Sequence, residues 1–206
     1  MKTISVLIAD DHKIVRMGLK AMFAQEKDIR VVGEAEDGDA ALAATRKLRP
    51  DVVVMDLMMP GRDGIEATAE LAKRLPDTRV VILTSFSTSD GIVRALEAGA
   101  LGAVLKTSDD SSLLTAIRAV ADGQRFVSPE ISQLIQNDPP AQQLSSRQEE
   151  VLHSITRGLT NRDIAAQLGI SEARVEEHVN AILQKINAAN RAEAVAIAMR
   201  KHLLKI

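Results

Sequence analysis

Five residues suited to phosphoryl chemistry follow short apolar runs of the chain. Asp10 and Asp11 come after ISVLIA, Asp56 ends DVVVMD, Thr84 ends RVVILT, and Lys106 ends AVLK. Clustered carboxylates repel one another, and a divalent cation relieves that repulsion; ligands that are all oxygen favour Mg²⁺ or a similar hard ion. A hydroxyl group and an ammonium group beside such a site can hold a phosphoryl group, because they donate to its oxygens and neutralise its charge.

Each of these residues also has a purely structural interpretation. Asp10 and Asp11 could cap the helix that follows them. Asp56 could be a turn residue at the end of a strand, and Lys106 a solvated surface lysine. The occurrence of all of them at the ends of four runs favours the chemical interpretation.

The apolar runs predict the scaffold that would bring these residues together. They lie at 4–9, 29–35, 51–56, 79–84 and 103–106, and near-continuous β-branched runs are typical of strands buried on both faces. Amphipathic segments such as GIEATAELAKRL separate them and predict helices. Five strands alternating with helices predict an α/β doubly wound parallel sheet, whose ligands bind beyond the carboxyl ends of the strands.

The pattern changes after Gly123. Residues 123–143 hold three of the six prolines and a polar cluster, so they predict a linker that allows one helical turn after Pro129. Beyond it the sequence shows only helical patterns, at 146–157, 161–168, 172–186 and 191–204. We therefore expect an α/β domain over 1–122 and an all-α, four-helix domain over 144–206.

Composition excludes several classes of protein. The 206 residues are 46% hydrophobic, as in an ordinary globular protein, and the net charge of -2 does not indicate a nucleic-acid or a membrane partner. No cysteine is present, which excludes disulfides and thiolate metal sites. No apolar run approaches the roughly 18 residues of a membrane span. We expect a cytoplasmic protein.

The motifs VLIADDHKIVRMGL, VVVMDLMMPGRDG, ILTS and GAVLK resemble the receiver domain of bacterial two-component response regulators. The resemblance covers all five strands and implies a flavodoxin-like sheet of order 2-1-3-4-5. It implies that Asp56 accepts a phosphoryl group from a sensor histidine kinase, with Mg²⁺ as the cofactor. Asp11 would bind Mg²⁺ directly and Asp10 through water, with Asp56 and the Met58 backbone carbonyl as further ligands.

The chain departs from the receiver pattern at one position. Receivers usually place Tyr or Phe three residues before the lysine, and rotation of that ring reports phosphorylation. Ala103 stands there instead, so we expect switching to run through Thr84 and the segment 86–98.

Haloacid-dehalogenase-type hydrolases also combine a strand-end Asp with Mg²⁺, a hydroxyl and a lysine. They need a second Asp two residues after the nucleophile, and here that residue is Met58, which cannot transfer a proton. We therefore expect that the chain is not an enzyme.

The segment from Leu144 to Ile186 resembles the LuxR-type helix-turn-helix, and together with DDHKIVRMGL it indicates the NarL/FixJ subfamily. Gly169 is placed to end the first helix of the motif, since it tolerates positive φ, and Ser171 to cap the second. The resemblance implies double-stranded DNA as a partner, a homodimer when phosphorylated, and RNA polymerase as a further candidate partner. A small helical packing domain is the alternative.

The second helix of this motif, the recognition helix, is expected to bury Val175, Val179, Ile182 and Ile186 and to turn its opposite face to DNA. Glu177 would accept from cytosine N4 and Asn180 would pair with adenine, while cations hold phosphates. The candidate DNA contacts are Arg162, Arg174, Glu177, His178, Asn180, Ala181, Gln184 and Lys185, with Arg191 as a further phosphate contact.

This helix is acidic for a DNA-binding surface. Residues 141–206 contain nine Lys/Arg and seven Asp/Glu, a weak footprint when phosphate neutralisation dominates affinity. Either the helix enters the major groove with low non-specific affinity, or the domain is a receiver-linked protein- or ligand-interaction module. In the last helix Ala194, Ile197, Ala198 and Lys201 form a small-residue face that would pair two DNA-binding domains or pack onto its own domain.

Overall fold

The computed structural model describes residues 3–85, 89–201 and 203–204. The chain forms two compact units, Met1–Asp138 and Pro139–Ile206, which are described separately below. Within the described residues no helix is both long enough and apolar enough to cross a membrane.

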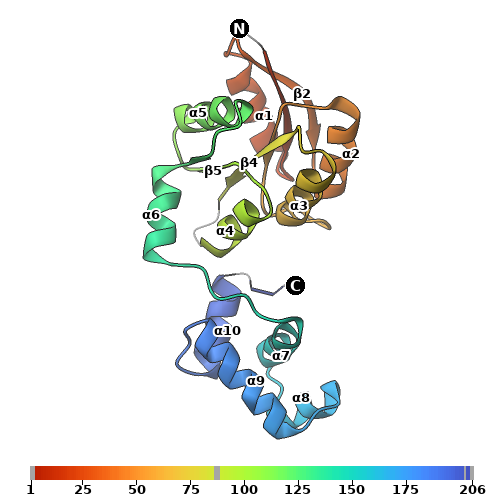
Figure 1. The fold of residues 1–206 in the computed structure, drawn as a ribbon, viewed down its shortest axis with the longest axis vertical. Helices are drawn as coiled ribbons and strands as arrows, with labels where there is room; N and C mark the ends of the chain where they lie inside the picture. The colour runs from red at the N-terminus through yellow and green to blue at the C-terminus, as the bar shows by residue number, and fades with distance from the viewer. Residues whose placement is uncertain (1–2, 86–88, 202, 205–206) are drawn as a thin grey trace. The chain divides into compact units, whose positions relative to one another are not determined.

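The first unit is built on a parallel sheet of order β2-β1-β3-β4-β5-β6 (Figure 1). Its strands are β1 (Ile4–Ala9), β2 (Ile29–Ala35), β3 (Val52–Met55), β4 (Arg79–Thr84), β5 (Gly102–Leu105) and β6 (Phe126–Val127). The predicted five-stranded order is confirmed, and β6 adds a sixth strand beyond β5. Because every pairing is parallel, the carboxyl ends of all six strands meet at one edge.

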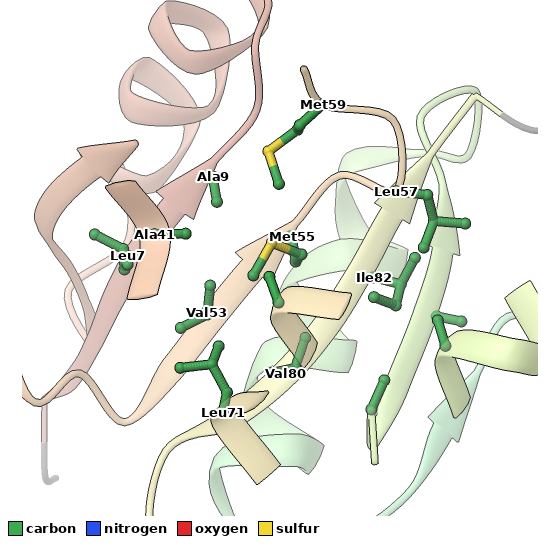
Figure 2. Close-up of a cluster of buried hydrophobic side chains, with 14 of the residues drawn as sticks. Leu7, Ala9, Ala41, Val53, Met55, Leu57, Met59, Leu71, Val80 and Ile82 are labelled. Carbon is green, nitrogen blue, oxygen red and sulfur yellow. The ribbon is translucent and has the colours of Figure 1, made fainter. Parts of the chain in front are cut away.

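Helices cover both faces of the sheet. On one face α1 (Lys13–Phe23) and α5 (Asp110–Ala121) pack on a cluster that includes Phe23 and Ile117. On the other, α2 (Gly38–Leu48), α3 (Gly64–Arg74) and α4 (Ser89–Glu97) pack on the cluster shown in Figure 2, where side chains such as Val53 and Met55 lie beside Leu71. Side chains buried on both faces explain why the strands are near-continuously apolar.

The expected linker at 123–143 differs from the structure. Residues 126–127 form β6, and α6 (Pro129–Asn137) is a nine-residue helix rather than a single turn. Ser128 caps α6, since its side chain accepts from the backbone N–H of Ile131, and Pro129 stands in the first turn where no N–H is needed. Ile131 is fully buried in the core of the sheet, so this segment belongs to the first unit.

The second unit contains α7 (Ser146–Thr156), α8 (Asn161–Leu168), α9 (Glu172–Lys185) and α10 (Arg191–Arg200), as predicted to within a few residues. Ser171 caps α9, and Gly169 ends α8 with φ of 64°, so both expected signals are confirmed. Their core joins residues from all four helices, among them Val151, Ile164 and Ile182.

The small-residue face of α10 is not an open surface in this unit. Ala194, Ile197 and Ala198 are buried in the unit's own core, and the Lys201 ammonium donates to the Pro139 carbonyl at 2.9 Å. Of the two alternatives for this face, packing onto its own domain is the one observed.

Candidate functional site

The carboxyl edge of the sheet brings together acidic and basic side chains from three strands. Lys106 follows β5, and its Nζ lies 2.5 Å from Asp10 Oδ2 and 2.7 Å from Asp56 Oδ2. Asp10 and Asp56, which follow β1 and β3, are 2% and 5% exposed. One ammonium group therefore holds two buried carboxylates together, as the strand-end positions predicted.

Burial and ion pairing compete at this edge. Burial raises the pKa of Asp56 above its ordinary value, and the hydrogen bond from Lys106 only partly offsets the effect. For Lys106, burial opposes the charge, but the bonds to Asp10 and Asp56 outweigh it and raise the pKa. Lys106 is therefore charged at neutral pH, and its ammonium group is close enough to pair with a negative charge on Asp56.

The same edge has the donors for a hard cation. Ligand atoms of Asp10, Asp11, His12 and Asp56 all lie within 4.8 Å of one another. Three carboxylates face a single ammonium, so negative charge remains uncompensated, and oxygen ligands suit Mg²⁺. His12 was not among the predicted residues; its Nδ1 lies 2.6 Å from Asp11 Oδ1, and adjacency in the sequence was the only signal for it.

The turn after Asp56 is held by packing on both sides of Met58. Leu57 and Met59 point into the core (Figure 2) and are 2% and 8% exposed, whereas Met58 is half exposed. The Met58 N–H approaches Asp56 Oδ1 at 3.5 Å. This alternation places the Met58 backbone beside the Asp56 carboxylate, where the Met58 carbonyl was predicted to bind Mg²⁺.

A glycine that the sequence analysis missed lets the chain pass close to Asp56. A Cβ on Gly64 would lie 2.0 Å from the Asp56 carbonyl oxygen, and the Gly64 N–H donates to the Leu57 carbonyl at 3.0 Å. The PGRDG segment placed a glycine there, but only the fold shows that it touches the backbone of the candidate acceptor.

Thr84 and Ala103 lie on the neighbouring strands. Thr84 is fully buried, and its carbonyl accepts from the Lys106 N–H at 2.8 Å, which fixes β4 against β5 at the site. Ala103 is fully buried; its register partner is Val127 of β6, and it shares a core cluster with Ile131 of α6. The position where receivers usually have an aromatic ring thus lies next to β6 in the sheet and in the core cluster that α6 joins. Residues 86–88 of the expected switching segment lie outside the described residues.

In the second unit, α9 carries the predicted two-faced pattern. Val175, Ile182 and Ile186 are buried and Val179 is half buried, whereas Glu177, Asn180 and Gln184 are exposed and His178 and Ala181 are intermediate. The exposed face therefore matches the one predicted to meet DNA.

The predicted phosphate-holding cations are not equivalent. Arg162 is exposed, and Arg174 Nη1 lies 2.9 Å from Glu177 Oε2. Lys185 donates to the Gln143 carbonyl at 2.8 Å and to Gln148 Oε1 at 2.9 Å. Arg191 donates to Asn161 Oδ1 at 3.0 Å and also to the Leu159 carbonyl. Lys185 and Arg191 thus bind their own unit in this structure, which the sequence pattern did not indicate.

Comparisons with known proteins agree with this geometry. Residues 6–118 match the family described as response regulator receiver domain, and residues 142–198 match that of bacterial regulatory proteins, luxR family. The chain is 38% identical to the transcriptional regulatory protein LiaR of Bacillus subtilis (strain 168), over 98% of this chain and 99% of LiaR.

Solved structures extend the likeness to the fold. The response regulator ChrA of a heme-sensing two-component system is 40% identical, with a TM-score of 0.60, over 99% of this chain and all of ChrA. The response regulator RcsB, solved as a complex with DNA, is 27% identical with a TM-score of 0.72, over 97% of this chain and 99% of RcsB. The chain therefore belongs to the two-component response regulators of the NarL/FixJ type, transcription regulators that join a receiver domain to a LuxR-type helix-turn-helix domain.

Proposed function

We propose that Asp56 accepts a phosphoryl group from a sensor histidine kinase and that this modification controls dimerisation and DNA binding. The observation that carries the proposal is the buried Asp56 carboxylate, 2.7 Å from Lys106 Nζ and within reach of the Asp10 and Asp11 carboxylates. A nucleophilic carboxylate beside an ammonium group and further metal-binding oxygens is the arrangement that phosphoryl transfer to an aspartate needs.

In the proposed transfer, a carboxylate oxygen of Asp56 bonds to phosphorus as the bond from phosphorus to the donor histidine nitrogen breaks. Mg²⁺, held by Asp10, Asp11, Asp56 and the Met58 carbonyl, would supply charge neutralisation at the phosphoryl oxygens. Lys106 follows the new charge from the carboxylate to a phosphoryl oxygen. The Thr84 hydroxyl donates to another oxygen, and because Thr84 ends β4, this bond carries the change toward α4.

For the output we propose that the exposed face of α9 enters the major groove as a dimer contacts two half-sites. The support is that Glu177, Asn180 and Gln184 are exposed on one face of α9, while its opposite face is buried in the core and its N-terminus is capped by Ser171. RcsB, 27% identical to this chain, has been solved as dimers bound to DNA. Contacts by Lys185 and Arg191 would require these side chains to leave their present partners, so Arg162 and Arg174 are the first candidates for phosphate.

Labelling with a small acyl phosphate tests the acceptor. Wild-type protein with Mg²⁺ is expected to gain one acid-stable, base-labile phosphoryl group, and Asp56→Asn is expected to gain none, because an amide is not a nucleophile. Asp77→Asn is the matched control: Asp77 is exposed and precedes β4, at the opposite edge of the sheet. Labelling of Asp56→Asn at the wild-type level would show that the acceptor is misassigned.

A second measurement separates DNA binding from the interaction-module alternative. Phosphorylated wild-type protein is expected to enrich a discrete sequence from a pool of random duplexes, and Asp56→Asn treated in the same way is expected to enrich it less. If phosphorylated protein enriches no sequence, the acidic α9 favours the interaction module instead.

A further inference from the structure

Arg16, in the first turns of α1, reaches back to the loop that carries the acidic pair. Its Nη1 donates to the Asp10 carbonyl at 2.7 Å and to the Asp11 carbonyl at 3.3 Å. The Arg16 side chain is only 13% exposed; its bond to the Asp10 carbonyl is the shorter and is partly buried, whereas its bond to the Asp11 carbonyl is exposed. One guanidinium group therefore binds two consecutive peptide carbonyls of the metal-binding loop.

The guanidinium group is itself anchored to the sheet. Arg16 Nε lies 3.5 Å from Glu34 Oε2, and Glu34 Oε1 accepts from Lys20 Nζ at 2.7 Å. The hydrogen bond from Lys20, together with the charge of Arg16, holds the pKa of Glu34 below its ordinary value. Glu34 lies on β2 opposite Ile8 of β1, so the anchor is in register with the strand that leads into the loop.

The other hydrogen bonds described for this loop are made by its N–H groups and do not involve the Asp10 and Asp11 carbonyls. His12 is the N-cap of α1, yet its side chain makes no capping hydrogen bond. The His12 N–H donates to Asp10 Oδ1 at 2.8 Å, and the Asp10 N–H donates to the Ala35 carbonyl at 3.1 Å. Lys106 and His12 contact the carboxylates themselves, whereas Arg16 binds the Asp10 and Asp11 carbonyls and so acts on the backbone from which both carboxylates project.

We propose that Arg16 is a positioning residue for the metal-binding carboxylates: it fixes the peptides of residues 10 and 11 so that both side chains converge beside Asp56. The proposal rests on the proposed Mg²⁺-dependent phosphorylation and adds a residue that touches neither metal nor phosphoryl group. A guanidinium group is suited to this role because its planar array of donors can bind two carbonyls and a carboxylate in one fixed geometry.

Metal binding to the unphosphorylated full-length chain provides the test. Mn²⁺ takes the same oxygen ligands, and the free ion can be counted by electron paramagnetic resonance. Arg16→Gln is expected to raise the Mn²⁺ dissociation constant about tenfold, the usual size of a loss in the shell that orients metal ligands. Lys20→Gln, which removes the other partner of Glu34 without touching the loop, is expected to stay within about twofold of wild type.

Phosphorylation kinetics provide a readout that general damage to the fold would not reproduce. In Arg16→Gln the Mg²⁺ concentration for half-maximal labelling of Asp56 is expected to rise by the same factor, while the rate at saturating Mg²⁺ returns to near the wild-type value. Glu34→Gln, which leaves Arg16 in place but weakens its anchor, is expected to shift both quantities in the same direction by a smaller factor.

An Mn²⁺ dissociation constant within twofold of wild type in Arg16→Gln would overturn the inference, as would a labelling rate that saturating Mg²⁺ does not restore. If Arg16→Gln does not fold, unchanged metal binding in Glu34→Gln overturns it. Wild-type protein that binds no Mn²⁺ and is not labelled on Asp56 would instead refute the proposed function.

Discussion

At the scale of single residues, the site depends on side chains that are costly to bury. Lys106, Asp10 and Asp56 are all removed from water, and breaking such a cluster by deleting one member leaves uncompensated charge. A buried cluster with one ammonium group and several carboxylates is not expected to stabilise the fold. The same excess of negative charge suits the site to bind a divalent cation, which would compensate the carboxylates and, under the proposed function, also the oxygens of a phosphoryl group.

Gly64 is a second residue on which the site depends, because a methyl group at this position would clash with the backbone of Asp56. A Cβ there would lie 2.0 Å from the Asp56 carbonyl oxygen and 3.0 Å from Leu57 Cα, and backbone atoms cannot swing aside. Gly64→Ala is therefore expected to lower the free energy of unfolding by about 1–3 kcal/mol and to slow labelling of Asp56. Urea unfolding and the rate of labelling by an acyl phosphate measure the two effects.

Gly18 in α1 provides the matched control for this substitution. A Cβ there meets no atom within 4 Å, so Gly18→Ala is expected to stabilise the protein by about 0.5–1 kcal/mol through helix propensity. If Gly64→Ala is as stable and as rapidly labelled as wild type, the close approach does not hold the acceptor in place.

At the scale of elements, β6 and α6 pack around Ala103, the position where receivers usually have an aromatic ring. They cover the edge of β5, and Ile131 packs in the same cluster as Ala103. A large ring at position 103 would have to share this space with α6, so the small residue and the additional helix are consistent with each other. At the far end of α6 the Ser89 hydroxyl donates to the Asp138 carbonyl, which ties the start of α4 to the last residue of the first unit.

In the recognition helix α9, one of the acidic residues is paired with a cation of the same helix. Arg174 and Glu177 are 69% and 64% exposed and form an i,i+3 ion pair, which contributes only about 0.2–0.5 kcal/mol. A DNA phosphate can therefore draw Arg174 away at little cost. If α9 meets DNA as proposed, we expect Glu177 to lower the affinity for arbitrary DNA in two ways, by its own negative charge and by pairing with Arg174.

Glu177→Ala is accordingly expected to bind random duplexes more tightly, because it removes a repulsive charge and releases Arg174. It is expected to lose about 1–3 kcal/mol of discrimination at one base pair of the selected sequence, because an acceptor for cytosine is gone. Titrations of selected and scrambled duplexes at two salt concentrations measure both effects.

Two further variants calibrate that experiment. Glu176 is exposed on α9 about 100° around the helix from Glu177, so it would lie nearer the DNA backbone than the bases. Glu176→Lys is therefore expected to strengthen binding to all duplexes about equally and to steepen the salt dependence by roughly one unit of slope. Glu149→Ala removes an exposed charge from α7 and is expected to change neither. Unaltered DNA binding in both α9 variants would mean that this helix is not at a DNA interface.

At the scale of the whole molecule, the two units have separate cores. The clusters on the two faces of the sheet contain residues from 4 to 135, and the cluster of the helical unit contains residues from 141 to 204. Each unit can therefore lose its packing while the other keeps its own, and damage to one should not spread through a shared core.

Ile182→Ala tests this independence. Ile182 is fully buried in the helical unit, so its truncation is expected to destabilise that unit by about 2–5 kcal/mol. Calorimetry is expected to show one transition shifted to lower temperature and one unchanged, with Asp56 labelled normally and DNA binding weakened. A single transition that shifts as a whole would show that the units unfold together.

The sequence by itself determined the strands, most helix boundaries and the residues of the acidic edge. The reason is that these features are local: β-branched runs set the strands, Gly169 and Ser171 set a turn, and parallel strands bring their carboxyl ends to one edge. The position of Asp56 relative to Asp10 and Lys106 follows from strand order, which the resemblance to receiver domains implied; the alternation of strands and helices predicted only the parallel sheet.

Only the tertiary structure decided what depends on contacts between distant segments. β6 is two residues long and becomes a strand only because β5 offers an open edge, so no local pattern announced it. In the sequence Lys185 resembles a solvated cation, but in the fold its ammonium group donates to Gln143, before α7, and to Gln148, within α7. Arg16 is an ordinary helix residue in the sequence; it reaches the acidic loop because tertiary packing sets α1 beside β2, where Glu34 fixes its direction.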